Sequence, residues 1–300
     1  SRLVLASMQL LVAVTGMIGN LLVILVILRN PRLLRNTYYF LVLHLAICDF
    51  FSNVFSSSDI YNSFSGRSMI SLPWLCKLWW PTHTVFFSAG VFFMVAISIV
   101  RYQAVAKPLK LPMSRWKVKV LAVLVYAFAT ICVSPYVLVL QFNNKSGCVE
   151  EWPVETLNIC CTLFLANVQY LIPVVLLSMV YWQICYVLVK QDREMKLLCA
   201  SITPLQRQNI SSYQRFRQHR DVRTFLVSFT VLVFFTVAAL PSQIIYILTA
   251  SNVIEFPWYY FWFGVLNSFG VSAVNPFIYR TLDKKLFSSF MKRMRKVLHG

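Results

Sequence analysis

The sequence predicts an all-α membrane protein in which seven transmembrane helices form a single bundle. Its 300 residues are 58% hydrophobic and only 13% charged, with a mean hydropathy of +0.66, values typical of a chain with several membrane spans. The hydrophobic residues form runs long enough to cross a hydrocarbon core of about 30 Å. The basic residues lie between these runs, where orientation in a membrane explains the net charge of +18, so we expect no nucleic-acid partner.

The third hydrophobic run, Trp74 to Tyr102, is expected to be the central helix. Between Cys76 and Arg101 the only residues able to carry charge are Lys77, beside the cysteine, and His83. At 1.5 Å per residue, a helix would place Cys76 and Arg101 about 37 Å apart. This length predicts an oblique crossing, with the six other spans packed around it.

The other spans follow from the same pattern of hydrophobic runs. Span 2 contains a carboxylate, Asp49, and span 5 is charge-free for 34 residues, which predicts that it projects beyond the bilayer. Spans 5, 6 and 7 contain Pro173, Pro241 and Pro276, and the polar, basic segment 190–223 is expected to be a mobile linker. One domain, 1–300, thus has spans at about 3–28, 37–60, 74–104, 120–141, 156–189, 222–249 and 256–280.

The C-terminal segment 282–298 repeats hydrophobic residues at helical spacing, and Lys and Arg occupy the other positions. This pattern predicts a short amphipathic helix after span 7 that lies against membrane lipids on the cytoplasmic leaflet.

The charges between the spans predict the orientation. All but four of the 28 Lys and Arg residues lie in the loops after spans 1, 3 and 5 or in the tail. By the positive-inside rule, these loops and the C-terminus are cytoplasmic, and the N-terminus is extracellular. On the outer side, Cys76 and Cys148 lie at the ends of spans, so we expect them to pair in an oxidising compartment. Asn144 begins an N-glycosylation acceptor in the same outer loop.

Polar residues inside the spans are the candidates for function. Asp49 is costly in mid-membrane, and we expect it to be a polar hub facing the bundle axis; the alternative is a protonated or hydrogen-bonded structural carboxyl. Pro276 frees a backbone carbonyl that needs a polar partner. Asn275 can supply that partner and also reach Asp49, with Ser272 nearby.

Several motifs occur in the order and spacing of one receptor family. They are Gly19 and Asn20, Leu45, Ala46 and Asp49, Trp74 and Cys76, Arg101 and Tyr102, Pro173 and Tyr181, Phe235 and Pro241, and Asn275, Pro276 and Tyr279 before the basic tail. On these motifs the chain resembles the rhodopsin-family (class A) G-protein-coupled receptors over essentially its whole length.

The resemblance implies a plasma-membrane receptor that is not an enzyme and needs no cofactor. It implies a disulfide between Cys76 and Cys148 that holds the second outer loop across the ligand mouth. Arg101, followed by Tyr102, would meet a heterotrimeric G protein once span 6 moves outward, and arrestin is a further candidate partner. The resemblance gives Tyr181 and Tyr279 the role of supporting Arg101 in the active state, and it places the hinge of span 6 at Phe235 and Pro241.

Two departures concern the switch and the core. An acidic residue usually precedes the arginine, but here it is Val100, so we expect Asp221 to pair with Arg101; the alternative is that Asp221 is a solvated loop charge. The family usually has a tryptophan before the span 6 proline, but this chain has Ala239 at that position. Phe87 or Phe235 would fill the space of the missing tryptophan.

A third departure concerns a sodium ion that family members often bind. Gly90 and Val271 replace two of the polar partners expected around such an ion. We therefore expect no metal beyond a weak sodium site at Asp49, Ser272 and Asn275.

Two ligand classes are disfavoured. A retinal receptor needs a lysine in span 7, but none occurs there and Phe269 stands at the corresponding position. An amine receptor needs a carboxylate where this chain has His83. We expect His83, one turn from Phe87, to line the pocket; the alternative is a hydrogen-bonded core histidine.

The outer loop around Cys148 is similar to that of peptide receptors of the neuropeptide Y, neuropeptide FF and orexin types. Its acidic residues would steer a cationic peptide inward, and the alternative is a plain solvated loop. An amidated basic neuropeptide is the expected ligand. The predicted pocket residues are Asp59, His83, Phe87, Glu150, Glu151, Gln169, Gln243, Tyr246, Trp262 and Phe269.

Other functions remain as alternatives. Within the family, these are a receptor for a lipid or another non-peptide ligand and a constitutively active orphan receptor. Outside it, a membrane transporter is the main rival, although the sequence has no internal repeats of the kind common in transporters. An intramembrane enzyme is disfavoured, because His44 and Asp49 lie in one helix and form no catalytic set.

Overall fold

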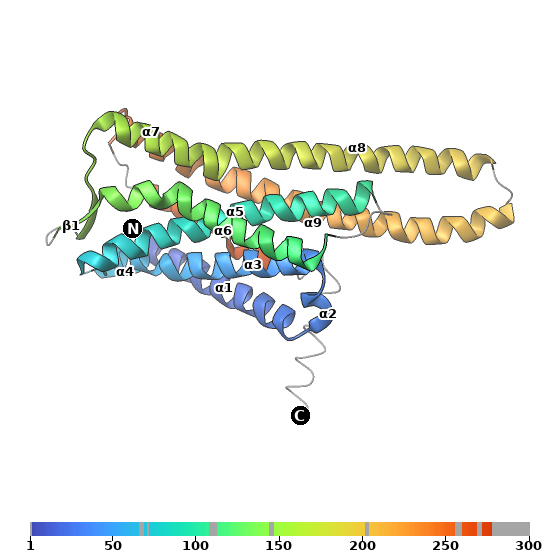
Figure 1. The fold of residues 1–300 in the computed structure, drawn as a ribbon, viewed down its shortest axis with the longest axis horizontal. Coiled ribbons are helices and arrows are strands. Elements are labelled where there is room, and N and C mark those ends of the chain that lie inside the picture. The colour runs from blue at the N-terminus through green and yellow to red at the C-terminus, as the bar shows by residue number, and fades with distance from the viewer. Residues whose placement is uncertain are drawn as a thin grey trace, which may run out of the picture.

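The computed structural model describes residues 2–65, 69–70, 72–107, 113–143, 147–201, 204–255, 260–268 and 272–277. Its helices form an elongated bundle, and a two-stranded hairpin lies at one end (Figure 1). Within this part of the chain, six helical stretches are long and apolar enough to cross a membrane: Leu3–Leu28, Thr37–Asn62, Pro73–Ala106, Arg115–Val139, Glu155–Leu197 and Phe229–Ala250. The seventh predicted span, 256–280, is described only in part, by α10 (Tyr260–Ser268) and residues 272–277.

The first two spans are joined by a short basic turn. Helix α1 (Arg2–Leu28) leads into the four-residue α2 (Pro31–Leu34). The predicted second span is interrupted at Ser56, which separates α3 (Thr37–Phe55) from α4 (Ser57–Ser65). At this position the Ser56 hydroxyl donates to the backbone carbonyl of Ser52 at 2.9 Å, a bond of the kind that bends helices.

Helix α5 (Pro73–Ala106) is the central helix, as the sequence predicted. It packs against α3, α6, α8 and α9. It begins with Pro73, whose missing N–H costs nothing in the first turn of a helix. Around its middle, Ala89, Val91 and Phe93 are fully buried, because neighbouring helices cover most of its surface there.

The fourth span and the outer loop follow directly. Helix α6 (Arg115–Val139) begins five residues before the predicted span because the Ser114 side chain accepts a hydrogen bond from the backbone of Lys117, capping the helix. It ends where the chain enters β1 (Leu140–Asn143), which pairs antiparallel with β2 (Gly147–Glu150).

The prediction of a linker at 190–223 was wrong for the described residues of this segment, which are helical. Helix α7 (Glu155–Ala166) continues through the π-helical turn Asn167–Leu171 into α8 (Ile172–Ser201), and α9 (Pro204–Ala250) begins three residues after α8 ends. Residues 190–201 are rich in good helix formers, and the ion pairs Lys190–Glu194 and Lys196–Asp192 support the helix at i,i+4 spacing. Figure 1 shows α8 and α9 extending past the other helices at the end opposite the hairpin.

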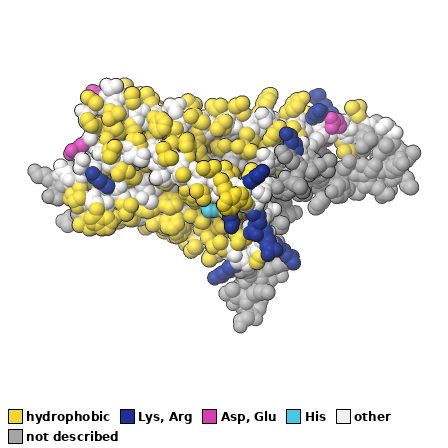
Figure 2. All heavy atoms as spheres, in the orientation of Figure 1, with side chains coloured by type: hydrophobic (Ala, Val, Ile, Leu, Met, Phe, Trp, Pro, Cys, Tyr) yellow, Lys and Arg dark blue, Asp and Glu magenta, His cyan; other side chains and the backbone are white. Residues whose placement is uncertain are grey.

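The surface is divided by residue type. Hydrophobic side chains cover the middle of the molecule, and Lys and Arg gather toward the end that carries α2. Carboxylates lie near the hairpin and also beside basic residues at the far end of α8 (Figure 2). Exposed residues of the hydrophobic zone include Ile131, Leu138 and Trp182, each more than two thirds exposed, as expected for side chains that face lipid. The predicted amphipathic helix at 282–298 lies outside the described residues.

Candidate functional site

The predicted disulfide between Cys76 and Cys148 is confirmed. Its Cα atoms are 5.4 Å apart, and 72 residues separate the two cysteines in the sequence. The bond joins β2 to the first turn of α5, and Cys76 packs in a small buried cluster with Ile70 and Leu140. The hairpin is therefore held across the end of the bundle. The predicted glycosylation site Asn144 lies outside the described residues.

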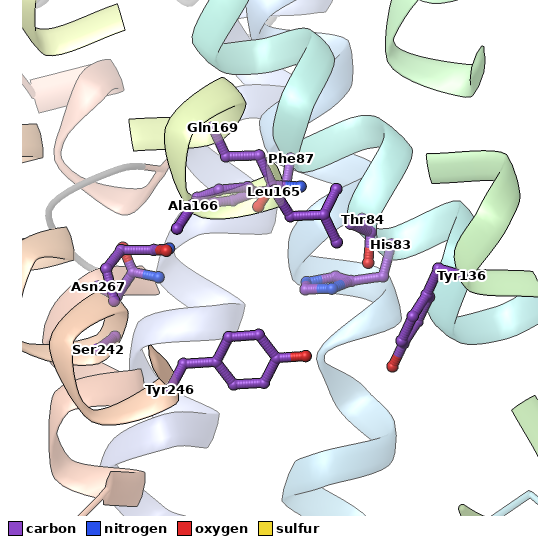
Figure 3. A pocket seen from close by; sticks show the side chains of 11 residues that line it. His83, Thr84, Phe87, Tyr136, Leu165, Ala166, Gln169, Ser242, Tyr246 and Asn267 are labelled. Carbon is purple, nitrogen blue, oxygen red and sulfur yellow. The ribbon is translucent and has the colours of Figure 1, made fainter. Parts of the chain in front are cut away.

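A cavity of about 180 Å³ lies between α5, the π-helical turn, α9 and α10 (Figure 3). It brings together five of the ten predicted pocket residues: His83, Phe87, Gln169, Gln243 and Tyr246. Tyr246 reaches from α9 toward the side of the cavity on which His83 and Tyr136 lie. The remaining lining residues, which the sequence analysis missed, are Thr84, Tyr136, Leu165, Ala166, Ser242 and Asn267.

Glu150 reaches this cavity through Tyr136. The Tyr136 hydroxyl donates to one carboxylate oxygen of Glu150 at 2.7 Å, and the indole N–H of Trp152 donates to the other at 2.9 Å. Glu150 thus lies at the rim and not in the wall. The Tyr136 position gave no signal in the sequence, because its role depends on the hairpin folding back over α6.

The other predicted pocket residues do not line the cavity or are not described. Asp59 lies on α4, which packs against α1, and it is not one of the residues that line the cavity. Glu151 is exposed after β2, where its backbone N–H donates to the Val139 carbonyl at 2.8 Å. Phe269 and the side chain of Trp262 lie outside the described residues.

Gln169 faces the cavity from the π-helical turn. Pro173 has no N–H to donate to the Gln169 carbonyl four residues earlier, and the wider turn accommodates the missing bond. The Gln169 side chain then donates to the Ser88 hydroxyl of α5 at 2.9 Å, in a buried position. The proline was visible in the sequence, but the direction in which the turn rotates its neighbours was not.

Two buried atoms of the cavity wall lack a hydrogen-bond partner among the described residues. They are the Ser242 hydroxyl oxygen and the Asn267 side-chain oxygen. Most buried polar atoms in proteins have a partner, and leaving one unpaired costs about 1–3 kcal/mol. These two atoms are therefore suited to hydrogen bonding with a polar group that enters the cavity.

In mid-membrane, the predicted contact between Asn275 and Asp49 is present. The Asn275 amide donates to the Asp49 carboxylate at 2.8 Å. The Asn53 amide donates to the Asp49 backbone carbonyl at 2.6 Å, and the Asn20 amide donates to the Ser272 carbonyl at 3.2 Å. These bonds tie three spans together. The described residues include no cluster of three His, Cys, Asp or Glu side chains suited to a metal, and the weak sodium site stays a prediction.

At the opposite end from the hairpin, Arg101 contacts Tyr38. One guanidinium nitrogen donates to the Tyr38 hydroxyl, and the guanidinium carbon lies 4.1 Å from the centre of the Tyr38 ring. The sequence analysis missed this partner because 63 residues separate the two. The side chain of the predicted partner, Asp221, and the whole of Tyr279 lie outside the described residues.

Two other predicted switch residues are buried between helices. Tyr181 shares a hydrogen bond of 2.6 Å with Ser98 of α5, and half-buried Tyr102 packs in the same cluster. Phe235 is fully buried beside Ala239, with its ring 5.9 Å from that of Tyr170. Phe235 therefore belongs to the core, whereas Phe87 lines the cavity.

Comparison with known proteins places these features in a family. Residues 19–279 match the sequence profile of the 7 transmembrane receptor (rhodopsin family). The chain is 25% identical to galanin receptor 2b of Danio rerio, over 94% of this chain and 72% of the relative. It is 24% identical to neuropeptide FF receptor 1 of Homo sapiens, over 93% and 67%. It is 25% identical to neuropeptide Y receptor type 6 of Oryctolagus cuniculus, over 98% and 81%.

Proposed function

Because the chain belongs to the rhodopsin family of seven-transmembrane receptors, which are multi-pass membrane proteins and not enzymes, we propose that it binds an extracellular peptide and activates a heterotrimeric G protein. The observation that carries this proposal is the cavity under the hairpin, with Gln169, Ser242, Tyr246 and Asn267 in its wall. Polar groups from several helices converge there, and two of their atoms are unpaired among the described residues.

The proposed orientation puts the hairpin outside the cell and α2 in the cytoplasm. Figure 2 supports it, because most Lys and Arg side chains gather at the α2 end of the hydrophobic zone, whereas carboxylates outnumber them at the hairpin end. This is the charge distribution of the positive-inside rule. Arg101, near the α2 end, would then face the cytoplasm.

The size of the cavity indicates how a peptide would bind. A volume of about 180 Å³ is below the roughly 300–1,000 Å³ of pockets that enclose a whole small ligand. One end or one or two side chains of a peptide would enter, and the remainder would lie over the hairpin. Two of the three relatives are named as neuropeptide receptors, and Glu150, Glu151, Glu155 and Glu255 would attract a basic peptide. We retain an amidated basic neuropeptide as the proposed ligand.

Helix α9 would carry the signal across the membrane. Ser242, Gln243 and Tyr246 of α9 line the cavity, and Phe235 and Pro241 lie next along the same helix. Suppose that the receptor alternates between two arrangements that differ in where α9 lies. A ligand that binds one arrangement more tightly shifts the equilibrium toward it. Outward movement of α9 at the cytoplasmic end would open the region of Arg101 to a G protein.

The proposal is tested by assaying nucleotide exchange on purified G proteins with a panel of basic, amidated peptides. In the variant E150Q/E151Q we expect an active peptide to lose about fivefold in potency, since each exposed charge contributes up to about 1 kcal/mol. Glutamine keeps a hydrogen-bonding group for Tyr136, so the hairpin should persist. E194Q, at the other end of the molecule, is the matched control and should not change potency.

Two outcomes would contradict the proposal. One is that no peptide of the panel stimulates nucleotide exchange by any G-protein class. The other is that liposomes containing the protein concentrate a solute, which would favour a transporter instead.

A further inference from the structure

We propose that Asn252 positions the final segment of α9 through a side-chain latch to α7, and that release of this latch regulates the receptor. The Asn252 side-chain amide donates to the carboxylate of Glu155, which lies 97 residues earlier in the chain. This contact is the Asn252–Glu155 latch. The inference deepens the proposed function, because it concerns how α9 is held, but the latch itself depends on neither the peptide nor the G protein.

The backbone at the end of α9 shows what an asparagine adds there. The Val253 N–H donates to the Leu248 carbonyl at 3.0 Å. The Asn252 N–H donates to the Thr249 carbonyl, also at 3.0 Å. Together these bonds form a Schellman motif, whose turn residue is left-handed and usually glycine. Asn252 has a φ of 52°, and no other non-glycine residue that the structure describes has a positive φ. Glycine would make this turn without strain, but it has no side chain to reach Glu155.

Glu155 is well placed to accept the bond. It is the first residue of α7, where a carboxylate complements the positive end of the helix dipole. Asn252 follows directly after the last turn of α9, which ends at Ala250. The two helices pack against each other. The latch therefore ties the start of α7 to the end of α9.

The latch and Pro241 bound the segment of α9 that lines the cavity. Ser242, Gln243 and Tyr246 line the cavity and lie between Pro241 and Asn252 in the sequence. Pro241 has no N–H for the carbonyl four residues earlier, and a proline inside a helix is a common position for a kink. Because the segment can bend at its Pro241 end, the bond at its other end helps to set where the three side chains lie.

The latch occurs in the same arrangement as the contact between Arg101 and Tyr38. A bond that is made in one arrangement and lost in another favours the first. Both side chains of the latch are exposed, so a basic group of a ligand can reach Glu155 and compete with the Asn252 amide. Release of the latch would let the final segment of α9 move and would weaken the arrangement in which Tyr38 holds Arg101.

The test is hydrogen–deuterium exchange of the intact chain in micelles, without ligand or G protein. N252G keeps the left-handed turn but removes the amide, and we expect exchange in residues 242–253 to become about fivefold faster, the equivalent of about 1 kcal/mol. N252D should also exchange faster, because aspartate cannot donate to Glu155. The matched control is E255Q, which neutralises another exposed carboxylate close to Asn252 in the sequence and should exchange as the wild type does.

The double variant E155Q/N252D exchanges the donor and the acceptor of the latch. The glutamine amide can donate to the aspartate carboxylate, and the net charge equals that of the wild type. We therefore expect hydrogen exchange to return to the wild-type rate. Exchange as fast as in N252D would overturn the latch, and so would an unchanged rate in N252G.

Ligand-free nucleotide exchange on purified G proteins tests the regulatory role. We expect N252G and N252D to raise it about fivefold, in line with the loss of one hydrogen bond, and E155Q/N252D to restore the wild-type rate. If hydrogen exchange changes and nucleotide exchange does not, the regulatory role is overturned. If the wild type stimulates no G protein at all, the proposed function fails together with that role, whereas the hydrogen-exchange result still decides whether the latch exists.

Discussion

Arg101 contacts Tyr38 at the end of the bundle opposite the hairpin, where the chain has Val100 in place of the acidic residue usual in the family. The contact combines a hydrogen bond from the guanidinium with stacking over the ring at 4.1 Å. A cation over an aromatic face contributes about 0.5–2 kcal/mol, and a hydrogen bond to a charged group about 1.5–3 kcal/mol. An aromatic residue can therefore hold the arginine with an energy similar to that of a carboxylate.

We expect Tyr38→Ala to raise signalling in the absence of ligand, because it frees the guanidinium for a G protein. A loss of about 2 kcal/mol would shift the equilibrium about 30-fold. Tyr38→Phe keeps the ring and should have a smaller effect. The measurement is ligand-free nucleotide exchange at matched receptor levels, with D221A in parallel. If D221A raises ligand-free nucleotide exchange and Tyr38→Ala does not, the predicted ion pair with Asp221 holds Arg101 and the Tyr38 contact does not.

The cavity shows which single residues could be predicted from the sequence and which could not. His83, Gln169 and Tyr246 were predicted because each is polar or aromatic in an apolar helix. Ser242 and Asn267 were missed, since a small polar residue in a span is usually bonded to its own helix backbone and gives no distinctive pattern. What distinguishes them is that each has a buried oxygen with no hydrogen-bond partner among the described residues.

At the scale of elements, close helix packing depends on small residues. A Cβ atom on Gly19 would lie 2.8 Å from a side-chain carbon of Pro276, so α1 approaches the last described segment through this glycine. On Gly264 of α10, a Cβ atom would meet no atom of the described residues within 4 Å. The two glycines look alike in the sequence but have different surroundings.

We expect Gly19→Ala to destabilise the protein by about 1–3 kcal/mol, because the added methyl group forces α1 and Pro276 apart. Gly264→Ala, the matched control, should be neutral or stabilising by up to about 1 kcal/mol, because alanine is the better helix former. Thermal unfolding in detergent measures both. Equal midpoints for the two variants would contradict the close contact at Gly19.

The helical boundaries were predicted less well than the spans. The segment 190–223 was interpreted as a linker because it is polar and basic, yet α8 and α9 include nearly all of it. Polarity reports exposure to water and not the absence of a helix, and Lys, Arg, Glu and Gln are good helix formers. The π-helical turn before Pro173 could not be predicted either, since a proline allows a kink, a bulge or a break.

At the scale of the whole molecule, the hairpin and its disulfide organise the end of the bundle that holds the cavity. Cys76 anchors β2 to the central helix, and Tyr136 bonds to Glu150 beside the cavity. These two links hold the rim in place before a ligand arrives. A preformed rim lowers the ordering cost of binding.

We expect Cys76→Ser to reduce peptide potency about tenfold to a hundredfold while the bundle still assembles. This corresponds to about 1.4–2.8 kcal/mol of the 2–4 kcal/mol that a disulfide typically contributes, because the peptide must then order the hairpin. Cys185→Ser removes an exposed free thiol far from the hairpin and is the control. Dose–response curves at equal surface expression measure both, and unchanged potency in Cys76→Ser would show that the hairpin is held without the bond.

The sequence by itself determined the membrane class, the order of the spans, the resemblance to the receptor family and the cysteine pair, because these depend on composition and on motifs read along the chain. The tertiary structure decided which side chains meet. Tyr38 reaches Arg101, Tyr136 reaches Glu150, and Arg35 joins the cations of α6 only because each helix has one rotation and a fixed set of neighbours in the bundle. Those rotations depend on packing between segments far apart in the sequence, and no local pattern records them.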